Sequence, residues 1–272
     1  MNSGDAALAA VLKRDRLVVI ATLIALTALA WAYVLWVRAG MSAPSPDMPS
    51  MTMTDMAAMI SPRFTEWTPI HFLFNFAMWA VMMVGMMTPS AAPMILLYTQ
   101  VARQASTLGR PFAPSAWFAS GYLLVWTAFA LLATLAQYGL ERLALLTPMM
   151  ESASRVFGGA VLIAAGLYQW APSKDACLSQ CRAPLSFVQR HGGFRAERLG
   201  SLRLGLRHGA YCVGCCWALM ALLFVGGVMN LLWIAGLMIF VLAEKMLPGG
   251  RVVSKFAGLG AIAAGAWYLG AA

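Results

Sequence analysis

Residues 209–228 read GAYCVGCCWALMALLFVGGV, a stretch of apolar and small residues without a charged side chain. A helix of this length rises roughly 30 Å, the thickness of the hydrocarbon core of a bilayer. The same stretch carries Cys212, Cys215 and Cys216 within five positions. It therefore predicts a transmembrane helix that presents a group of thiols.

The whole chain has the composition of an integral membrane protein. Of its 272 residues, 61 % are hydrophobic and 11 % are charged, whereas an ordinary soluble domain has about 45–50 % and about 25 %. So few charges cannot cover that much apolar surface, and intrinsic disorder is excluded as well. Five cysteines are too sparse for a disulfide scaffold. The net charge of +9 suits loops that face anionic lipid, so nucleic acid is not expected as a partner.

Hydrophobic runs predict an all-α fold, a polytopic bundle of about seven transmembrane helices. The runs cover residues 17–37, 71–88, 115–137, 154–170, 209–228, 231–247 and 256–271. The first run is longer than the roughly 7–15 apolar residues of a cleaved signal peptide, so it predicts a retained anchor helix. The chain then divides into a tail and anchor helix (1–40), a methionine-rich outer loop (41–66) and a six-helix metal-binding domain (67–272) with an inner loop at 171–208.

The distribution of Lys and Arg predicts the orientation. If the N-terminus lies inside, fifteen of the 19 basic residues fall on the inner side. Positive residues concentrate in the cytoplasmic loops of membrane proteins. We therefore expect a cytoplasmic N-terminus and a C-terminus on the outer side.

Two apolar segments resemble each other in sequence. Residues 156–169 align without gaps to 255–268 with six identities in fourteen positions. In the expected topology the two segments cross the membrane in opposite directions, a pattern typical of the inverted three-plus-three repeats of transporters. Chance similarity within a small apolar alphabet is the alternative.

All five cysteines fall on the expected inner side. His208, Cys212, Cys215 and Cys216 share one face of a helix, and Cys177 and Cys181 share a face if the inner loop is helical. A reducing cytosol keeps such thiols free, and clustered cytosolic cysteines are typically metal-binding or catalytic. Thiolate and imidazole ligands favour Cu(I), with zinc as the alternative. Burial as small hydrophobic residues explains one cysteine well and three within five positions poorly.

A second stripe of candidate ligands follows the run at 71–88. His71, Asn75, Met78, Met82 and Met86 lie on one helical face. Thioethers on such a face could pass Cu(I) across the membrane without burying a charged side chain. Methionines that fill gaps in the bundle are the alternative interpretation.

The outer loop and the run at 231–247 add further candidates. The loop contains Met48, Met51, Met53, Met56 and Met59, a spacing that resembles the methionine-rich arms of copper uptake proteins. An interfacial or partner-contacting strip is the alternative. Glu244, at the inner end of its run, is a candidate carboxylate ligand or counter-charge, or it pairs with Lys245 or with loop arginines.

Several short motifs together resemble a family of bacterial membrane proteins. They are Met82-Met83-x-x-Met86-Met87-x-Pro89-Ser90, Cys177-x3-Cys181-Arg182-x-Pro184, Gly209-x-x-Cys212-x-Gly214-Cys215-Cys216-Trp217-Ala218-Leu219-Met220 and Glu244-Lys245. This set is similar to the DUF2182 family of predicted metal-binding integral membrane proteins, over roughly residue 67 to the C-terminus. The resemblance implies a metal protein of the bacterial inner membrane and fixes neither the metal nor an activity. With the orientation expected from the basic residues, the C-terminus would face the periplasm.

Three functions fit these residues. The leading hypothesis is Cu(I) binding and transfer or transport between outer methionines and the inner Cys/His cluster, with the bilayer, the metal and a membrane enzyme or metallochaperone as partners. The second is thiol–disulfide electron transfer by Cys212-x-x-Cys215 with Cys177 or Cys181. The third is a non-catalytic subunit or assembly factor of a larger membrane complex. No phosphate-binding glycine loop or hydrolase triad is present, so enzymatic activity is not favoured.

Overall fold

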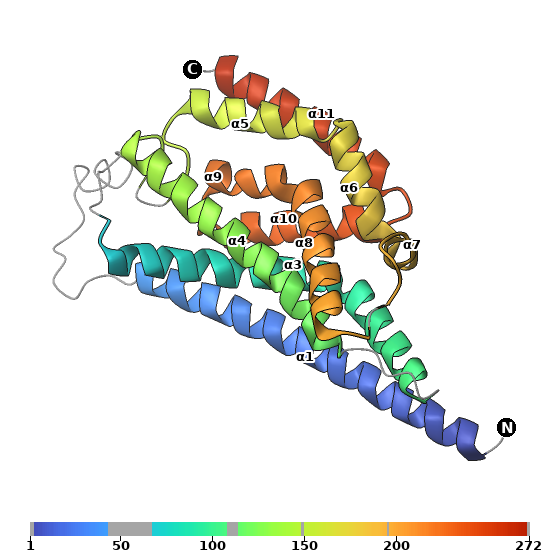
Figure 1. The fold of residues 1–272 in the computed structure, drawn as a ribbon. Coiled ribbons are helices and arrows are strands. Elements are labelled where there is room, and N and C mark those ends of the chain that lie inside the picture. The colour runs from blue at the N-terminus through green and yellow to red at the C-terminus, as the bar shows by residue number, and fades with distance from the viewer. Residues whose placement is uncertain (1–2, 43–66, 108–113, 148–149, 195, 271–272) are drawn as a thin grey trace.

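The computed structural model describes residues 3–42, 67–107, 114–147, 150–194 and 196–270 (Figure 1). Every regular element in these residues is a helix, which confirms the predicted all-α fold. The predicted outer loop lies almost entirely outside the described residues. Its methionines, Met48, Met51, Met53, Met56 and Met59, therefore lie outside them too.

Five helices of the described part are long and apolar enough to cross a membrane. These segments are Leu17–Ala39, Pro69–Ala105, Ser115–Arg142, Arg198–Gly226 and Gly250–Gly270. The predicted number of seven is not confirmed, because the two remaining apolar helices, α5 (Arg155–Tyr168) and α10 (Leu231–Met246), have only 14 and 16 residues. A full crossing takes about 17–25 residues. The fold is a helical membrane bundle in which two apolar helices are shorter than a full crossing.

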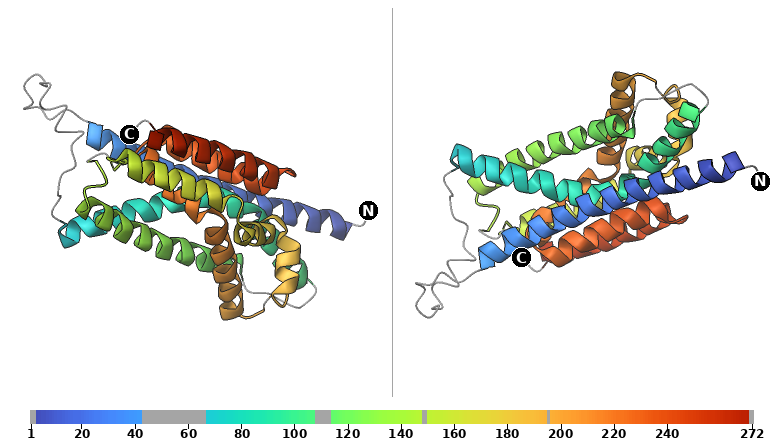
Figure 2. Two further views of the ribbon diagram at one scale, coloured as in Figure 1. Left: turned by 90° about the horizontal axis from the view of Figure 1, so that it is seen from above. Right: turned by 90° about the horizontal axis from the view of Figure 1, so that it is seen from below.

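The helices α1 (Ser3–Ser42) and α3 (Pro69–Thr107) lie side by side (Figures 1 and 2). Gly85 allows this approach, since a Cβ there would lie 3.0 Å from the side chain of Ala30. Helix α3 continues well beyond the predicted end at residue 88, although Pro89 and Pro93 lie within it. Each proline removes one helical hydrogen bond and bends the helix. Figure 1 shows α3 changing direction in its second half.

The helices α4 (Ser115–Arg142) and α8 (Arg198–Ala221) cross at glycine residues. A Cβ at Gly121 would collide with the backbone of α8, and one at Gly205 would collide with the backbone of α4. Small residues allow helix backbones to approach this closely in membrane proteins. The crossing brings Tyr122 of α4 next to Cys212 of α8.

The two segments that resemble each other in sequence form an antiparallel helix pair, α5 and α11 (Gly250–Gly270). A Cβ at Gly166 would lie 2.6 Å from the carbonyl of Gly258, and one at Gly159 would lie 2.9 Å from that of Gly265. Because the earlier glycine of α5 meets the later glycine of α11, the two helices run in opposite directions. The sequence repeat therefore corresponds to a helix pair matched at its glycines, and the wider three-plus-three repeat stays a prediction.

Most of the predicted inner loop at 171–208 is helical. It contains α6 (Pro172–Arg182), α7 (Pro184–Arg190) and the start of α8. Pro172 and Pro184 occupy first-turn positions, where a missing N–H leaves no helical hydrogen bond unmade. Leu178 and Phe187 are fully buried, and α6 packs against α8. A segment with many charges therefore still folds onto the bundle through a few apolar side chains.

The short helix α9 (Leu223–Gly226) follows α8 directly. It ends at Gly227, whose φ of 91° suits glycine. The end of α3, α6 and α7 lie toward the N-terminal end of α1, whereas the start of α3, the end of α4 and the C-terminus lie toward the other end (Figure 1). This arrangement groups the basic connections at one end of the molecule, and their side of a membrane stays a prediction.

Candidate metal centre

The buried face of α8 carries four of the predicted ligands. His208, Cys212, Cys215 and Cys216 are each at most 3 % exposed. They recur every three or four residues and so share one side of the helix. The structure therefore places one imidazole and three thiols on the interior side of α8.

Helix α6 supplies the two remaining cysteines. The sulfur of Cys177 lies over Gly214, where a Cβ would be 2.7 Å from it. The thiol of Cys181 lies next to those of Cys212 and Cys215, and its interaction with these two thiols together with burial raises the pKa of Cys181 well above its ordinary value. All five cysteines are free thiols. We call Cys181, Cys212, Cys215 and Cys216 the thiol cluster.

The ammonium group of Lys245, on α10, is buried against the thiol cluster. Its Nζ lies 2.8 Å from the Cys212 sulfur and 3.0 Å from the Ser90 hydroxyl. The hydroxyl of Tyr122 lies 3.2 Å from the same sulfur and donates to the Met87 carbonyl at 3.0 Å. Helices α3, α4, α8 and α10 therefore meet at Cys212.

Two residues of this site, Tyr122 and Lys245, are not among the ligands predicted from the sequence. Tyr122 was not predicted, because a tyrosine in an apolar run is ordinary in a membrane helix. The sequence singles out Lys245 only as a partner of Glu244 and as part of the Glu244-Lys245 motif, and not as a neighbour of the thiols. The sequence does contain a signal for Lys245, which is its position in a largely apolar helix. An ionisable residue inside a membrane segment typically has a specific partner.

Two thiols of the cluster donate hydrogen bonds to a backbone carbonyl within the same helix. Those of Cys215 and Cys216 donate to the carbonyl of Cys212 at 3.1 and 2.9 Å. Among the residues that the structure describes, no three or more His, Cys, Asp and Glu side chains are arranged to hold a metal ion. Because thiols are weak hydrogen-bond donors, rotating them away from these partners costs little. The candidate ligands are gathered in one place, and they could hold a metal ion only after such a rotation.

His208 sits in an aromatic cage next to the thiol cluster. Its ring centroid lies 5.1, 5.7 and 5.8 Å from those of Phe187, Phe118 and Tyr122. In the described part of the chain, its buried Nδ1 has no hydrogen-bond partner. Buried polar atoms are rarely left in this state, because an unsatisfied polar group in an apolar site costs free energy. A ligand at this nitrogen would remove that cost.

The predicted methionine stripe, Met78, Met82 and Met86, is buried along α3. Each of these side chains is at most 2 % exposed. The neighbouring Met87 connects the stripe to the thiol cluster, because its carbonyl accepts the hydroxyl of Tyr122 that also contacts Cys212. The three thioethers therefore form a buried row along α3, and the backbone next to Met86 contacts a residue that also contacts Cys212.

A polar network lies at the other end of the methionine stripe. Asn75 is fully buried and accepts a hydrogen bond from Gln137 at 3.1 Å. Gln137 also donates to Glu141 at 2.8 Å, and Glu141 accepts from the indole of Trp67 at 2.7 Å. The ring of His71 lies 5.0 Å from the Trp67 ring. His71 and Asn75 are thus parts of one network at the start of α3.

Glu244 has polar partners outside the thiol cluster. Its carboxylate lies 2.8 Å from the ammonium group of Lys174 and accepts a hydrogen bond from Ser254 at 2.7 Å. Its counter-charge is therefore Lys174 and not the neighbouring Lys245, which contacts Cys212. The interaction holds α6, α10 and α11 together beside the thiol cluster.

The fold and the site define a helical membrane protein with a buried group of thiols beside a thioether-lined helix. The chain belongs to the PpoB2 family of copper chaperones, whose model matches residues 76–268. That region contains every predicted ligand from Met78 to Glu244 and leaves out His71. The match supports a copper-related family and does not name DUF2182. Comparisons with curated proteins and with solved structures each found no match.

Proposed function

We propose that this protein binds Cu(I) at the thiol cluster and hands it to a partner protein. The observation that carries the proposal is the meeting of Cys181, Cys212, Cys215 and Lys245 from three different helices. Helices bring soft ligands together in this way where a metal is to be held in a bundle. The copper-chaperone family supports copper as the metal.

The chemistry of the ligands favours Cu(I) over zinc. Thiolate and thioether sulfurs are soft ligands that select Cu(I), whereas a structural zinc site needs four ligands in a tetrahedron. The methionine stripe offers sulfurs that bind Cu(I) well and zinc poorly. In this proposal, Met78, Met82 and Met86 form a neutral path along α3, and Cys212 with Cys181 or Cys215 forms the resting site. His208 is an additional ligand through its unpartnered Nδ1.

Lys245 balances the charge of the occupied site. Two thiolates with one Cu(I) carry a net charge of −1, which is unfavourable in a low-dielectric interior unless a cation lies close by. The ammonium group 2.8 Å from Cys212 provides that cation. The occupied site, with Lys245 included, is then neutral.

The proposed placement of the two sets of ligands on opposite sides of the membrane follows from their redox stability. Thioethers keep their ligand form in an oxidising compartment better than thiols, which form disulfides there. We therefore place the methionine-rich segment and His71 on the periplasmic side, and the thiol cluster on the cytoplasmic side of the bacterial inner membrane. The metal would pass to a membrane enzyme or a metallochaperone that docks at one of these faces.

The copper content of the protein tests this proposal. The full-length chain is produced in cells grown with added copper and purified in detergent under reducing, oxygen-free conditions. We expect about one copper ion per chain, with zinc at background, because the ligands are soft sulfur atoms. Stoichiometric zinc, or no metal above the level of an unrelated membrane protein purified in parallel, would contradict it.

A further inference from the structure

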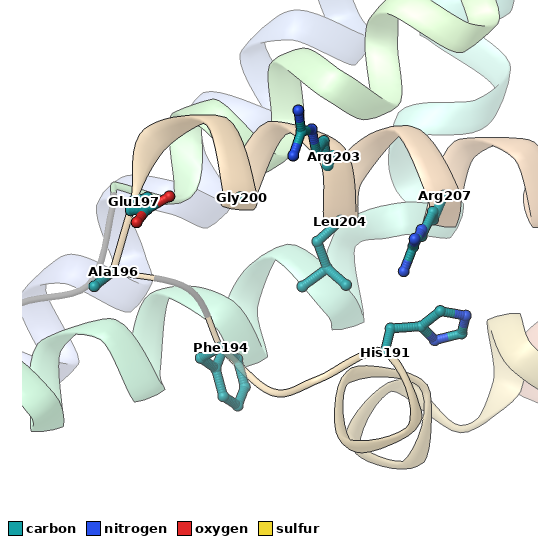
Figure 3. Close-up of a pocket in the computed structure, with 8 residues that line it drawn as sticks. All are labelled: His191, Phe194, Ala196, Glu197, Gly200, Arg203, Leu204 and Arg207. Carbon is teal, nitrogen blue, oxygen red and sulfur yellow. The ribbon is translucent and has the colours of Figure 1, made fainter.

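A hollow of about 460 Å³ lies beside the first turns of α8 (Figure 3). Arg203 and Arg207 line it from α8, and His191 lines it from the connection that follows α7. Phe194 and Leu204 provide apolar surface. In Figure 3 the side chain of Arg207 extends from α8 toward the ring of His191.

The hollow carries a positive charge. Arg203 and Arg207 lie one helical turn apart along α8, and among the described residues that line the hollow Glu197 is the only one with a carboxylate. In the described part of the chain, neither Arg203 nor Arg207 forms an ion pair. A concave site with this charge attracts anions and repels a free metal cation. Guanidinium groups also bind carboxylates in a bidentate manner, which gives such a site specificity for them.

One aromatic side chain separates the hollow from the candidate metal centre. The ring of His191 lies 4.4 Å from the ring of Phe187, and Phe187 lies 5.1 Å from His208. Phe187 is fully buried. His208 lies one helical turn before Cys212. A chain of ring contacts from His191 through Phe187 to His208 therefore connects the hollow with the candidate metal centre.

We infer that the hollow admits or releases Cu(I) as an anionic complex with a small thiol that carries carboxylates. We call the hollow in this role the vestibule. The inference rests on the proposed copper function and names the carrier that would serve it. The carboxylates bind Arg203 and Arg207, and the half-buried ring of Phe194 contacts the rest of the carrier.

The exchange conserves charge and oxidation state. Two bonds between copper and the carrier sulfurs break, and two bonds to the sulfurs of Cys181 and Cys212 form. Two protons pass from the protein thiols to the released carrier thiolates. Copper remains Cu(I) throughout, so no oxidant or reductant is needed. The reverse sequence delivers the metal from the protein to the carrier.

The test compares two copper donors on the metal-free, full-length protein in detergent. One donor is the Cu(I) complex of glutathione, which is anionic, and the other is the Cu(I) complex of acetonitrile, which is cationic. We expect the variant R203Q/R207Q to take copper from the glutathione complex at least about tenfold more slowly than wild type, because the attracting charge is gone. Its rate with the acetonitrile complex should not fall. The variant R190Q/R198Q, whose arginines lie nearby but do not line the hollow, should match wild type with both donors.

Two other results would overturn the inference in different ways. If R203Q/R207Q takes copper from both donors at the wild-type rate, or slows equally with both, the hollow is not the vestibule, while the copper site itself stands. If wild type takes copper from neither donor, the proposed function fails and the vestibule has no cargo. A copper-free measurement separates these cases further: S-methylglutathione, which has no free thiol, should bind to wild type and to C212S/C215S/C216S, and not to R203Q/R207Q.

Discussion

A variant in which Cys212, Cys215 and Cys216 are all serine is expected to lose its copper, from about one ion per chain to background. Serine keeps the size of the side chain and removes the soft sulfur. Cys181 would then be the only remaining member of the thiol cluster, and one thiolate does not hold Cu(I) against cellular thiols. Elemental analysis of the purified variant, set against wild type prepared in the same way, measures the effect.

A matched control separates loss of ligands from loss of the fold. Val213 lies in the same turn of α8 and is half-buried, but it has no sulfur. The variant V213S places a hydroxyl in the same region and should keep wild-type copper. Retention of copper by the triple cysteine variant, with a normal elution profile in size-exclusion chromatography, would show that the metal binds elsewhere.

Replacing Lys245 by leucine is expected to weaken Cu(I) binding about 10- to 100-fold. A hydrogen bond to a charged group contributes about 1.5–3 kcal/mol, and each 1.4 kcal/mol or so is a factor of ten in affinity. Leucine occupies apolar space there without the charge and without a sulfur atom that could bind copper. Competition against a Cu(I)-specific chromogenic chelator measures the affinity of the detergent-purified protein.

The control for Lys245 is another lysine at the same end of the chain. Lys255 is exposed, and its ammonium group lies 5.4 Å from the ring of Trp170 rather than beside a sulfur. The variant K255L should bind copper as wild type does. Tighter copper binding by K245L would mean that the ammonium group competes with the metal for Cys212, which is the opposite of charge balance.

Much of the candidate site could be predicted from the spacing of residues along α8. His208, Cys212, Cys215 and Cys216 recur at helical intervals, and a helix places such residues on one face whatever its neighbours are. The pair Cys177 and Cys181 follows the same rule within α6. Local periodicity therefore predicted which residues share a face, and the structure places Cys181 on the thiols of α8.

Contacts between distant segments could not be predicted in this way. Lys245 reaches Cys212 and Glu244 reaches Lys174 across gaps of 33 and 70 residues in the chain. These pairs depend on how α6, α8 and α10 are rotated against one another, and no local pattern encodes that rotation. The same limit explains why Tyr122 was missed, since its position depends on the glycine crossing of α4 and α8.

The helix boundaries show a further limit of hydropathy. The hydrophobic run at 71–88 ends at Thr88 and Pro89, yet α3 continues to Thr107. Packing against neighbouring helices offsets the hydrogen bonds that Pro89 and Pro93 remove. The segment 171–208, predicted as an inner loop, is helical for a related reason. Its many charged residues lower its mean hydropathy, although a few buried apolar side chains, such as Leu178 and Phe187, pack it against the bundle.

X-ray absorption at the copper edge of the loaded wild-type protein tests the central claim most directly. The proposed site predicts Cu(I) with about two or three sulfur ligands, with or without one imidazole nitrogen. A spectrum of Cu(II), or a first coordination shell of nitrogen and oxygen without sulfur, would contradict the assignment of the metal to the thiol cluster.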